Sequence, residues 1–456
     1  MNKNKHYNRC NAVSISLRKR KRKRKLNRLQ CRLNFSQKKK KRKKEEKKEN
    51  FQPNTTISHL HPLSNIKRLP PTTDRSVGAS FSSLSAMRRM TWLAAAAAAA
   101  AMCWLVAAAG AAGPCRFPAV FNFGDSNSDT GGFWAAFPAQ QAPFGMTYFR
   151  RPAGRASDGR LVVDFLGKHS VGSGYRHGAN FATLASTALQ PNTSLFVTGI
   201  SPFFLAVQLN QMRELRNKVL TSNGNNGQLP APDVLHNALY TIDIGQNDLT
   251  SNLGSQSIET VKQSLPSVVS KISSAVQELY NIGARNIMVF NMAPIGCYPS
   301  FLTKLKHTSN DMDGYGCMKT YNSAVTYYNE LLNNSLAEVR KKLQDASIVY
   351  LDKHAVTLEL FRHPKAHGLK YGTKACCGYG DGAYNFNPDV YCGSSKVLNG
   401  KTVTAKACAD PQNYVSWDGI HATEAANKII ASSLMSGSYS YPPFDLSKLC
   451  HLQPIA

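Results

Sequence analysis

The sequence predicts an α/β fold for residues 113–456, arranged as three layers (α/β/α) around a central parallel sheet. Short apolar runs alternate with longer segments of helical periodicity, which is the pattern of successive β-α-β units. Of the 456 residues, about 340 belong to this part, enough for one large domain. No internal repeat interrupts the alternation, so a repeat architecture is not indicated.

Four apolar runs of strand length supply the predicted sheet. They are Ala119–Phe123, Leu239–Ile244, Asn286–Met292 and Ile348–Leu351. Runs without polar alternation are typical of strands that are buried on both faces of a parallel sheet. Ligands of such sheets bind at the carboxyl ends of the strands, so the residues that follow each run are the candidates for a site.

Helical periodicity occupies the intervals between the strands. The predicted helices are Leu205–Leu220, Ser257–Tyr280, Met318–Leu343 and Thr423–Leu434. Pro266 lies inside the second of these and is a candidate break. The segment Gly372–Pro411 is rich in Gly, Asn and Cys and has little periodicity. We expect a disulfide-linked loop region there rather than a second domain.

The first 86 residues differ sharply from the rest. They hold 25 Lys and Arg against 4 Asp and Glu, a net charge of +21 out of +29 for the whole chain. The runs RKRKRKRK (Arg18–Lys25) and KKKKRKK (Lys38–Lys44) lie here, and such a segment is expected to be disordered. It is either a nuclear-localisation or nucleic-acid patch, a solvated tail, or sequence upstream of the true start codon.

Residues 87–112 have the organisation of a secretory signal peptide. Met87-Arg88-Arg89 is a charged start, Met90 to Gly113 is uncharged and Ala-rich, and small residues around Ala109–Ala112 suit cleavage. We therefore favour Met87 as the start, in which case residues 1–86 need not belong to the natural protein. With the basic segment retained, the apolar run is long enough for a signal anchor.

Both alternatives place residues 113–456 in the secretory pathway, and a nuclear location conflicts with both. We expect a secreted protein with no nucleic-acid partner, and no stable membrane insertion unless the signal is uncleaved. Two sequons, at Asn192 and Asn333, are compatible with export and are candidate glycosylation sites.

Cysteine usage agrees with export. Eight cysteines follow the signal segment: Cys115, Cys297, Cys317, Cys376, Cys377, Cys392, Cys408 and Cys450. An even number in an exported chain suggests disulfides, although the connectivity cannot be deduced from sequence. A zinc site is disfavoured because no pair has CxxC spacing. The adjacent Cys376 and Cys377 are expected to bond to two different partners.

Polar residues that are candidates for a catalytic role follow the predicted strands. In FNFGDSNSDTGG (Phe121–Gly132), Ser126 is a candidate nucleophile, with an ordinary turn as the structural alternative. In WDGIH, Asp418 and His421 are three residues apart, and we expect them on one face of a helical turn, where such pairs also cap helices. Asn247 follows the second strand and is a candidate amide donor, or an N-cap.

The order of these motifs resembles a known family. GDSNSDTG, GQND and WDGIH resemble blocks I, III and V of the GDSL esterase/lipases of the SGNH hydrolase superfamily. PFGMTYFRRPAGRASDGRLVVDFL, GANFATLASTAL and GARNIMVFNMAPIGCYP look like the plant branch, and the resemblance covers roughly residues 117–436. It implies a flavodoxin-like SGNH fold and a carboxylic ester hydrolase located in the apoplast or cell wall.

Position by position, the resemblance implies that Ser126 is the nucleophile, His421 the general base and Asp418 the acid that orients it. The implied oxyanion hole consists of the Ser126 N–H, the Asn247 amide and the N–H at about Ala185, where the family normally has glycine. Glycine also allows a positive φ. Loss of one such donor would lower the rate roughly 10²–10³-fold. The implied two-step mechanism needs no metal or organic cofactor.

The resemblance leaves the substrate open between a small-molecule and a polysaccharide ester. A cell-wall polysaccharide O-acetylesterase is at least as plausible as a lipase, because no long apolar helix is available as an interfacial lid. A fucosidase-like glycosidase usually needs two flanking carboxylates, for which Asp125, Asp129 and Asp248 are candidates. A non-catalytic secreted binding protein is disfavoured because every triad position is filled. Oligomeric state cannot be inferred.

Overall fold

The protein is described by a computed structural model over residues 117–166, 174–191, 199–222, 227–380 and 382–444. The predicted basic segment 1–86, the signal segment 87–112, the sequon at Asn192, Cys115 and Cys450 lie outside the described residues.

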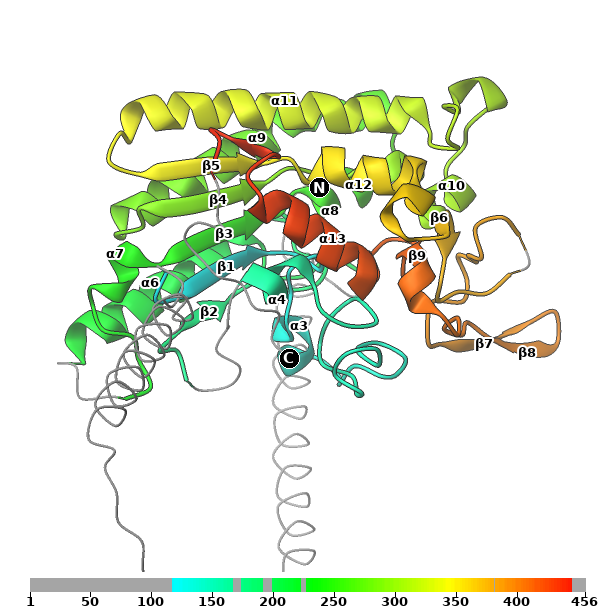
Figure 1. The fold of residues 1–456 in the computed structure, drawn as a ribbon, viewed down its shortest axis with the longest axis horizontal. Coiled ribbons are helices and arrows are strands. Elements are labelled where there is room, and N and C mark those ends of the chain that lie inside the picture. The colour runs from blue at the N-terminus through cyan, green and yellow to red at the C-terminus, as the bar shows by residue number, and fades with distance from the viewer. Residues whose placement is uncertain (1–116, 167–173, 192–198, 223–226, 381, 445–456) are drawn as a thin grey trace, which may run out of the picture. The chain divides into compact units, whose positions relative to one another are not determined.

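A six-stranded sheet forms the centre of the fold, in the order β10-β5-β4-β3-β1-β2 (Figure 1). Its strands are β1 Val120–Gly124, β2 Gly178–Asn180, β3 Leu239–Asp243, β4 Asn286–Phe290, β5 Ser347–Leu351 and β10 Ser440–Tyr441. The four predicted strands are confirmed and pair in parallel, with β10 as an antiparallel edge strand. They are almost wholly buried, as their unbroken apolar runs require.

The four predicted long helices are confirmed as α6 Leu205–Thr221, α9 Ile258–Asn281, α11 Lys319–Lys342 and α13 Glu424–Met435. Helix α9 continues through Pro266, so the candidate break is not there. Ser257 caps the start of α9, because its hydroxyl accepts the Thr260 N–H, and Thr423 caps the start of α13, because its hydroxyl accepts the Ala426 N–H.

Shorter helices connect these elements. They are α3 Gly132–Ala136, α4 Val162–Leu166, α7 Val234–Asn237, α8 Gln246–Thr250, α10 Pro299–Lys304 and α12 Lys353–Arg362, with 3-10 turns at Ile295–Cys297, Ser309–Asp311, Pro364–His367 and Pro411–Asn413. In Figure 1, α13 crosses the front of the sheet and α9 lies behind it. Helices α4 and α12 pack against α13, while α6 and α11 pack against α9, which confirms the three-layer α/β/α arrangement.

The segment Gly372–Pro411 is linked by disulfides, as predicted. Cys376 bonds to Cys408 and Cys377 to Cys392, so the adjacent cysteines do use different partners. A third disulfide joins Cys297 to Cys317. The segment is not wholly irregular: it contains a hairpin of β7 Ser395–Leu398 and β8 Lys401–Thr404, and β6 Tyr371–Ala375 pairs with β9 Tyr414–Ser416 beside it.

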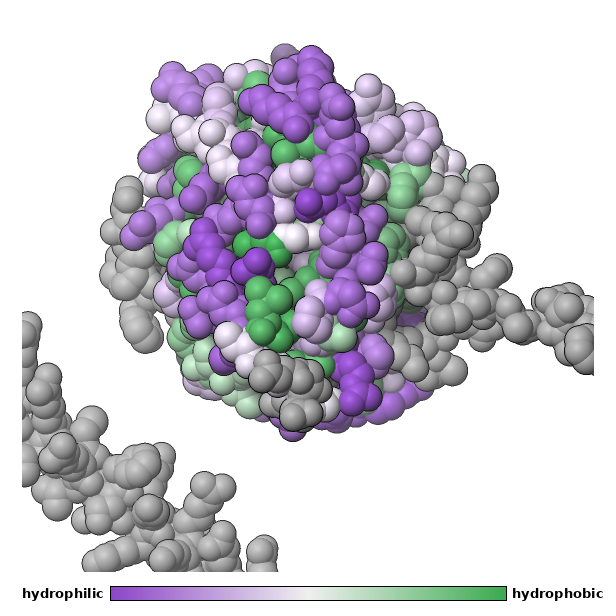
Figure 2. Space-filling model, turned by 90° about the vertical axis from the view of Figure 1, so that its left-hand side faces the viewer, coloured by the Kyte–Doolittle hydropathy of each residue, from purple (hydrophilic) through white to green (hydrophobic). Residues whose placement is uncertain are grey.

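The two ends of the sheet differ in character. Figure 2 shows the side at which the strands begin, where hydrophilic side chains cover most of the coloured surface. At the opposite, carboxyl ends, polar side chains are buried, among them Asp125, Asp129, Asp243 and Asp248. Burial of a charged group without partners is costly, so this edge is where an organised site is expected. Within the described ranges, no helix combines the length and apolar character that crossing a bilayer requires.

Candidate active site

A turn directly after β1 carries the predicted nucleophile. Both backbone groups of Gly124 bond to the Gln208 side chain of α6: its N–H donates to Oε1 at 2.9 Å and its C=O accepts from Nε2 at 2.8 Å. A Cβ at Gly124 would lie 2.2 Å from Ser128 Oγ and 2.5 Å from Asp243 O, so only glycine fits. The chain then turns and leaves Ser126 buried at the carboxyl edge of the sheet.

The bend between β9 and α13 carries the other two predicted triad residues, and its conformation corrects the expectation. Asp418 and His421 do not lie on a helical turn. Gly419 has φ 94°, which no α-helix contains, and a Cβ there would lie 2.5 Å from the Phe386 ring. Asp418 Oδ1 closes the bend by accepting the N–H groups of Ile420 at 3.0 Å and His421 at 2.9 Å.

The structure brings the three predicted triad residues together. His421 Nε2 lies 2.8 Å from Ser126 Oγ, and His421 Nδ1 lies 2.7 Å from Asp418 Oδ2. Burial raises the pKa of Asp418, but the charge of His421 and its hydrogen bonds outweigh this and lower it. Burial lowers the pKa of His421, but the charge and hydrogen bond of Asp418, with the charge of Asp125, raise it overall.

The three predicted oxyanion donors lie around the same turn. Asn247 is in α8, and its Nδ2 lies 2.9 Å from Ser186 O and 3.3 Å from Asp125 Oδ2. The Leu184 N–H donates to Asp129 at 2.8 Å, so both neighbours of Ala185 are held by residues of this site. Within the described part of the chain, the N–H groups of Ser126 and Ala185 have no hydrogen-bond acceptor. Both N–H groups are therefore free to receive a ligand oxygen.

Alanine adopts the backbone conformation that glycine usually provides at this position. Ala185 has φ 62°, in the left-handed region that costs an L-residue roughly 1–2 kcal/mol. The bonds to Leu184 and Ser186 impose this conformation on it. The departure from the family pattern therefore leaves the backbone geometry in place and stores a small strain.

We expect Ala185→Gly to raise the free energy of unfolding by up to about 1 kcal/mol. Relief of the left-handed strain outweighs the greater chain entropy of glycine in the unfolded state, and the N–H is kept. Urea unfolding measures the stability, and kcat/KM should stay within a few-fold of wild type. Ala182→Gly is the matched control, because Ala182 is buried without a positive φ and should lose stability. A destabilised Ala185→Gly would contradict the strain argument.

Two neighbouring carboxylates are committed to the backbone. Asp129 accepts the N–H groups of Gly131 at 2.7 Å, Gly132 at 2.6 Å and Phe133 at 3.1 Å, besides that of Leu184. Asp248 accepts the N–H groups of Ala188 at 2.7 Å and Leu189 at 2.9 Å. Burial raises the pKa of Asp248 to about 6. Both side chains thus organise loops around the nucleophile turn.

A clamp on the start of α13 was not anticipated from the sequence. Ser157 Oγ donates to Ala422 O at 2.9 Å, and Asp158 Oδ1 accepts the Glu424 N–H at 2.8 Å. Arg160 forms a buried ion pair with Glu424 at 2.8 Å. The clamp lies in SDGR (residues 157–160), within the longer segment that resembles the plant branch and for which the sequence predicts no role. It fixes the chain immediately after His421.

The disulfide-linked segment holds the other side of the bend. The Cys376 N–H donates to Ser416 O at 3.0 Å and the Cys377 N–H to Trp417 O at 2.6 Å. Both cysteines are cross-linked, so the segment that they form directly after β6 cannot move away freely. Asp418 therefore follows a segment with a fixed path.

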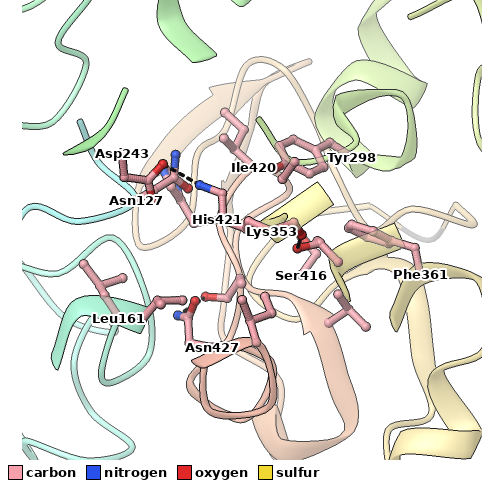
Figure 3. Close-up of a pocket in the computed structure, with 16 residues that line it drawn as sticks. Asn127, Leu161, Asp243, Tyr298, Lys353, Phe361, Ser416, Ile420, His421 and Asn427 are labelled. Carbon is pink, nitrogen blue, oxygen red and sulfur yellow. Dashed lines mark hydrogen bonds and ion pairs between the residues drawn. The ribbon is translucent and has the colours of Figure 1, made fainter. Parts of the chain in front are cut away.

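A small cavity lies beneath the bend (Figure 3). Polar residues lining it include Asn127, Asp243, Lys353 and His421, and apolar ones include Leu161, Phe361, Ile420 and Ile430. Its volume of about 30 Å³ suits water-sized occupants rather than an acyl chain or sugar. It lies between the predicted triad residue His421 and Lys353.

The remaining predicted site residue is Asn333. It lies within α11 and is half-buried, and its Oδ1 has no hydrogen-bond partner in the described part of the chain. Ser335 of the same sequon bonds to the Ser273 hydroxyl of α9 at 2.7 Å. Glycosylation of Asn333 stays a prediction, at a site less open than a surface loop.

Residues 120–434 match the family model of the GDSL-like Lipase/Acylhydrolase, a range that includes Ser126 and His421. A GDSL esterase/lipase of Arabidopsis thaliana is 57% identical over 351 residues, covering 74% of this chain and 92% of that protein. Alpha-L-fucosidase 3 of Arabidopsis thaliana is 40% identical over 356 residues, covering 74% and 93%. A solved catalytic mutant of an acetylxylan esterase from Geobacillus stearothermophilus aligns with TM-score 0.31 and 11% identity, over 74% of this chain and 96% of that one.

Proposed function

The chain belongs to the plant GDSL-like lipase/acylhydrolase family and is a carboxylic ester hydrolase, and we propose that Ser126, His421 and Asp418 are its catalytic triad. The observation that carries the proposal is the continuous hydrogen-bonded chain from Ser126 Oγ through both imidazole nitrogens to Asp418, at 2.8 and 2.7 Å. A serine hydroxyl is a weak nucleophile until a base so placed removes its proton.

The proposed reaction has two steps. Ser126 attacks the ester carbonyl while His421 takes its proton, and Asp418 stabilises the imidazolium that forms. The N–H groups of Ser126 and Ala185, with the Asn247 amide, bind the oxyanion. In the structure Asn247 Nδ2 contacts Ser186 O and Asp125, so one of these contacts is exchanged for the oxyanion when the tetrahedral intermediate forms. His421 then protonates the leaving alcohol, and water releases the acid.

A glycosidase is the less favoured alternative. One relative is named a fucosidase, and a glycosidase usually needs two carboxylates that flank the bond it cleaves. Asp129 and Asp248 are fully engaged by backbone N–H groups, and Asp125 accepts hydrogen bonds from Asn127 and Asn247. These contacts favour the ester-hydrolase assignment for this site.

The test is a substrate screen with the purified protein. p-Nitrophenyl esters of increasing acyl length and acetylated xylan are assayed for released acid, beside the Ser126→Ala variant. A preference for acetate, and acetate release from xylan, would support a polysaccharide O-acetylesterase. A preference for long chains would support a lipase. Release of sugar instead of acid would revive the glycosidase and overturn the proposal.

We also propose that the protein is secreted, with residues 1–86 absent, residues 87–112 a cleaved signal peptide, and residues 113–456 the hydrolase domain. Three disulfides among the described residues support exposure to an oxidising compartment. Amino-terminal sequencing of the protein from the extracellular fluid tests this. A first residue between Ala112 and Cys115 is expected, and a chain that retains residues 1–86 would contradict it.

A further inference from the structure

A buried lysine beneath the nucleophile turn has no part in the proposed triad. Lys353 is the first residue of α12, after β5, and its ammonium pairs with Asp243 at 2.5 Å. Asp243 ends β3, two strands away in the sheet, so the lysine side chain crosses the end of β4. There its ammonium lies 5.9 Å from the centre of the Phe290 ring. Both partners are less than a tenth exposed.

This is an unfavourable place for a lysine by local criteria. The first residue of a helix lies at the positive end of the helix dipole, where a cation is disfavoured. Removal of an ammonium from water is costly, and apolar residues often replace buried ion pairs without loss of stability. Core packing therefore does not account for the choice of lysine at this position.

The charge of Lys353 acts on the carboxylate next to the nucleophile. Gly124 and Asp243 are paired between β1 and β3, and the Asp125 N–H donates to Asp243 O at 3.2 Å. Two buried carboxylates are thus neighbours. Burial and the negative charge of Asp243 raise the pKa of Asp125 to about 7, while Lys353 and hydrogen bonds from Asn127 oppose the rise.

Asp125 in turn contacts the proposed catalytic groups. Its Oδ1 accepts the backbone and side-chain N–H groups of Asn127, each at 2.9 Å, and its Oδ2 lies 3.3 Å from the Asn247 amide nitrogen. Its negative charge also raises the pKa of His421. In Figure 3, Lys353 extends toward Asp243 beside Asn127 and His421.

We propose that Lys353 is a positioning residue: by offsetting the charge of Asp243 it favours the ionised form of Asp125, and the ionised Asp125 orients the Asn247 amide and stabilises the imidazolium of His421. The inference rests on the proposed triad. Other titratable groups near this cluster are Asp248, Tyr298, Tyr328, Asp352, His354 and Asp418. The phenols stay protonated because burial raises the pKa of both tyrosines.

The test is the pH profile of kcat/KM for p-nitrophenyl acetate. In Lys353→Met the acid-side midpoint should rise by about one pH unit, because Asp125 then holds its proton to higher pH. At pH 6 this lowers kcat/KM about tenfold. In Asp243→Asn the midpoint should fall, because the charge that repels Asp125 is gone. In an Asp125→Asn background, Lys353→Met should cause no further shift, since the group through which it acts is absent.

Arg155→Met is the matched control, because Arg155 and Asp164 form an equally buried ion pair that does not act on Asp125 or His421. It should lower the melting temperature without moving the midpoint. A Lys353→Met profile that keeps the wild-type midpoint, or a shift of equal size in the Asp125→Asn background, overturns the inference. If Lys353→Met does not fold, the pH profile of Asp243→Asn is the test instead. An acid-side midpoint of kcat/KM that stays at the wild-type pH in Asp243→Asn then overturns the inference. Wild-type activity that persists in Ser126→Ala would instead overturn the proposed triad.

Discussion

Ser126→Ala should lose ester hydrolysis by about 10⁴-fold or more in kcat while keeping the fold. Ser126 Oγ makes the 2.8 Å contact with His421 Nε2, and no other hydroxyl has such a contact with an imidazole in the described part of the chain. Its removal deletes the atom that would form the acyl-enzyme. The oxyanion donors remain, so some catalysis above the uncatalysed rate should survive. Initial rates on p-nitrophenyl acetate measure the loss.

The same turn offers a matched control in Ser128→Ala. Ser128 is buried two residues away, and its Oγ has no hydrogen-bond partner in the described part of the chain. This variant therefore removes a hydroxyl of the same kind without removing a bond, and it should keep kcat within a few-fold. Labelling by a serine-reactive fluorophosphonate should modify the wild type and Ser128→Ala but not Ser126→Ala. Equal losses in the two variants would show that the turn, and not the nucleophile, was damaged.

The sequence predicts an element correctly where burial alone determines the pattern of its apolar residues. The strands β1, β3, β4 and β5 are buried on both faces, so each had to be an unbroken apolar run. β2 and β10 have three and two residues, too few for any periodicity, and they pair only because the finished sheet presents an edge to them.

The hairpin of β7 and β8 was missed although a signal existed. Asn399 and Gly400 form its turn with φ 49° and 77°, and Asn-Gly is the strongest short-range hairpin signal. The flanking strands are mostly exposed, so apolar alternation was weak and the cysteine-rich composition dominated the interpretation. Here the turn residues, rather than the hydrophobic pattern, carried the information.

The candidate site, like the fold, is predicted by the sequence only in part. The motifs around Ser126, Asn247 and His421 were predicted because family resemblance orders them along the chain. The backbone between Asp418 and His421 was predicted wrongly, because three-residue spacing suits a helical turn and Gly419 permits another conformation. Lys353 left no local signal, since its partner lies 110 residues away and across another strand. Contacts that only the tertiary fold creates leave no periodic pattern of residues in the sequence.

Asp418→Asn should lower kcat by about 10⁴-fold with little loss of stability. Asparagine keeps the shape, and its Oδ1 still accepts the N–H groups that close the bend. Its amide nitrogen takes the place of Oδ2 and donates to His421 Nδ1, which then has to be the unprotonated nitrogen. The proton moves to Nε2, and an imidazole protonated at Nε2 cannot accept the proton of Ser126. The wrong tautomer, rather than a lost contact, produces the effect.

The pH dependence separates this explanation from a general loss of structure. Asp418 raises the pKa of His421, so its removal lowers that pKa and the neutral imidazole persists to lower pH. In an Asp125→Asn background, where position 125 no longer titrates, the residual activity of Asp418→Asn should therefore fall off at a more acidic pH than that of Asp125→Asn alone. Asp345→Asn, which changes an exposed carboxylate paired with Arg285, should leave both rate and profile unchanged. An acid limb that stays where Asp125→Asn alone has it would mean that His421 does not gain its proton affinity from Asp418, and the assignment of the orienting acid would fail.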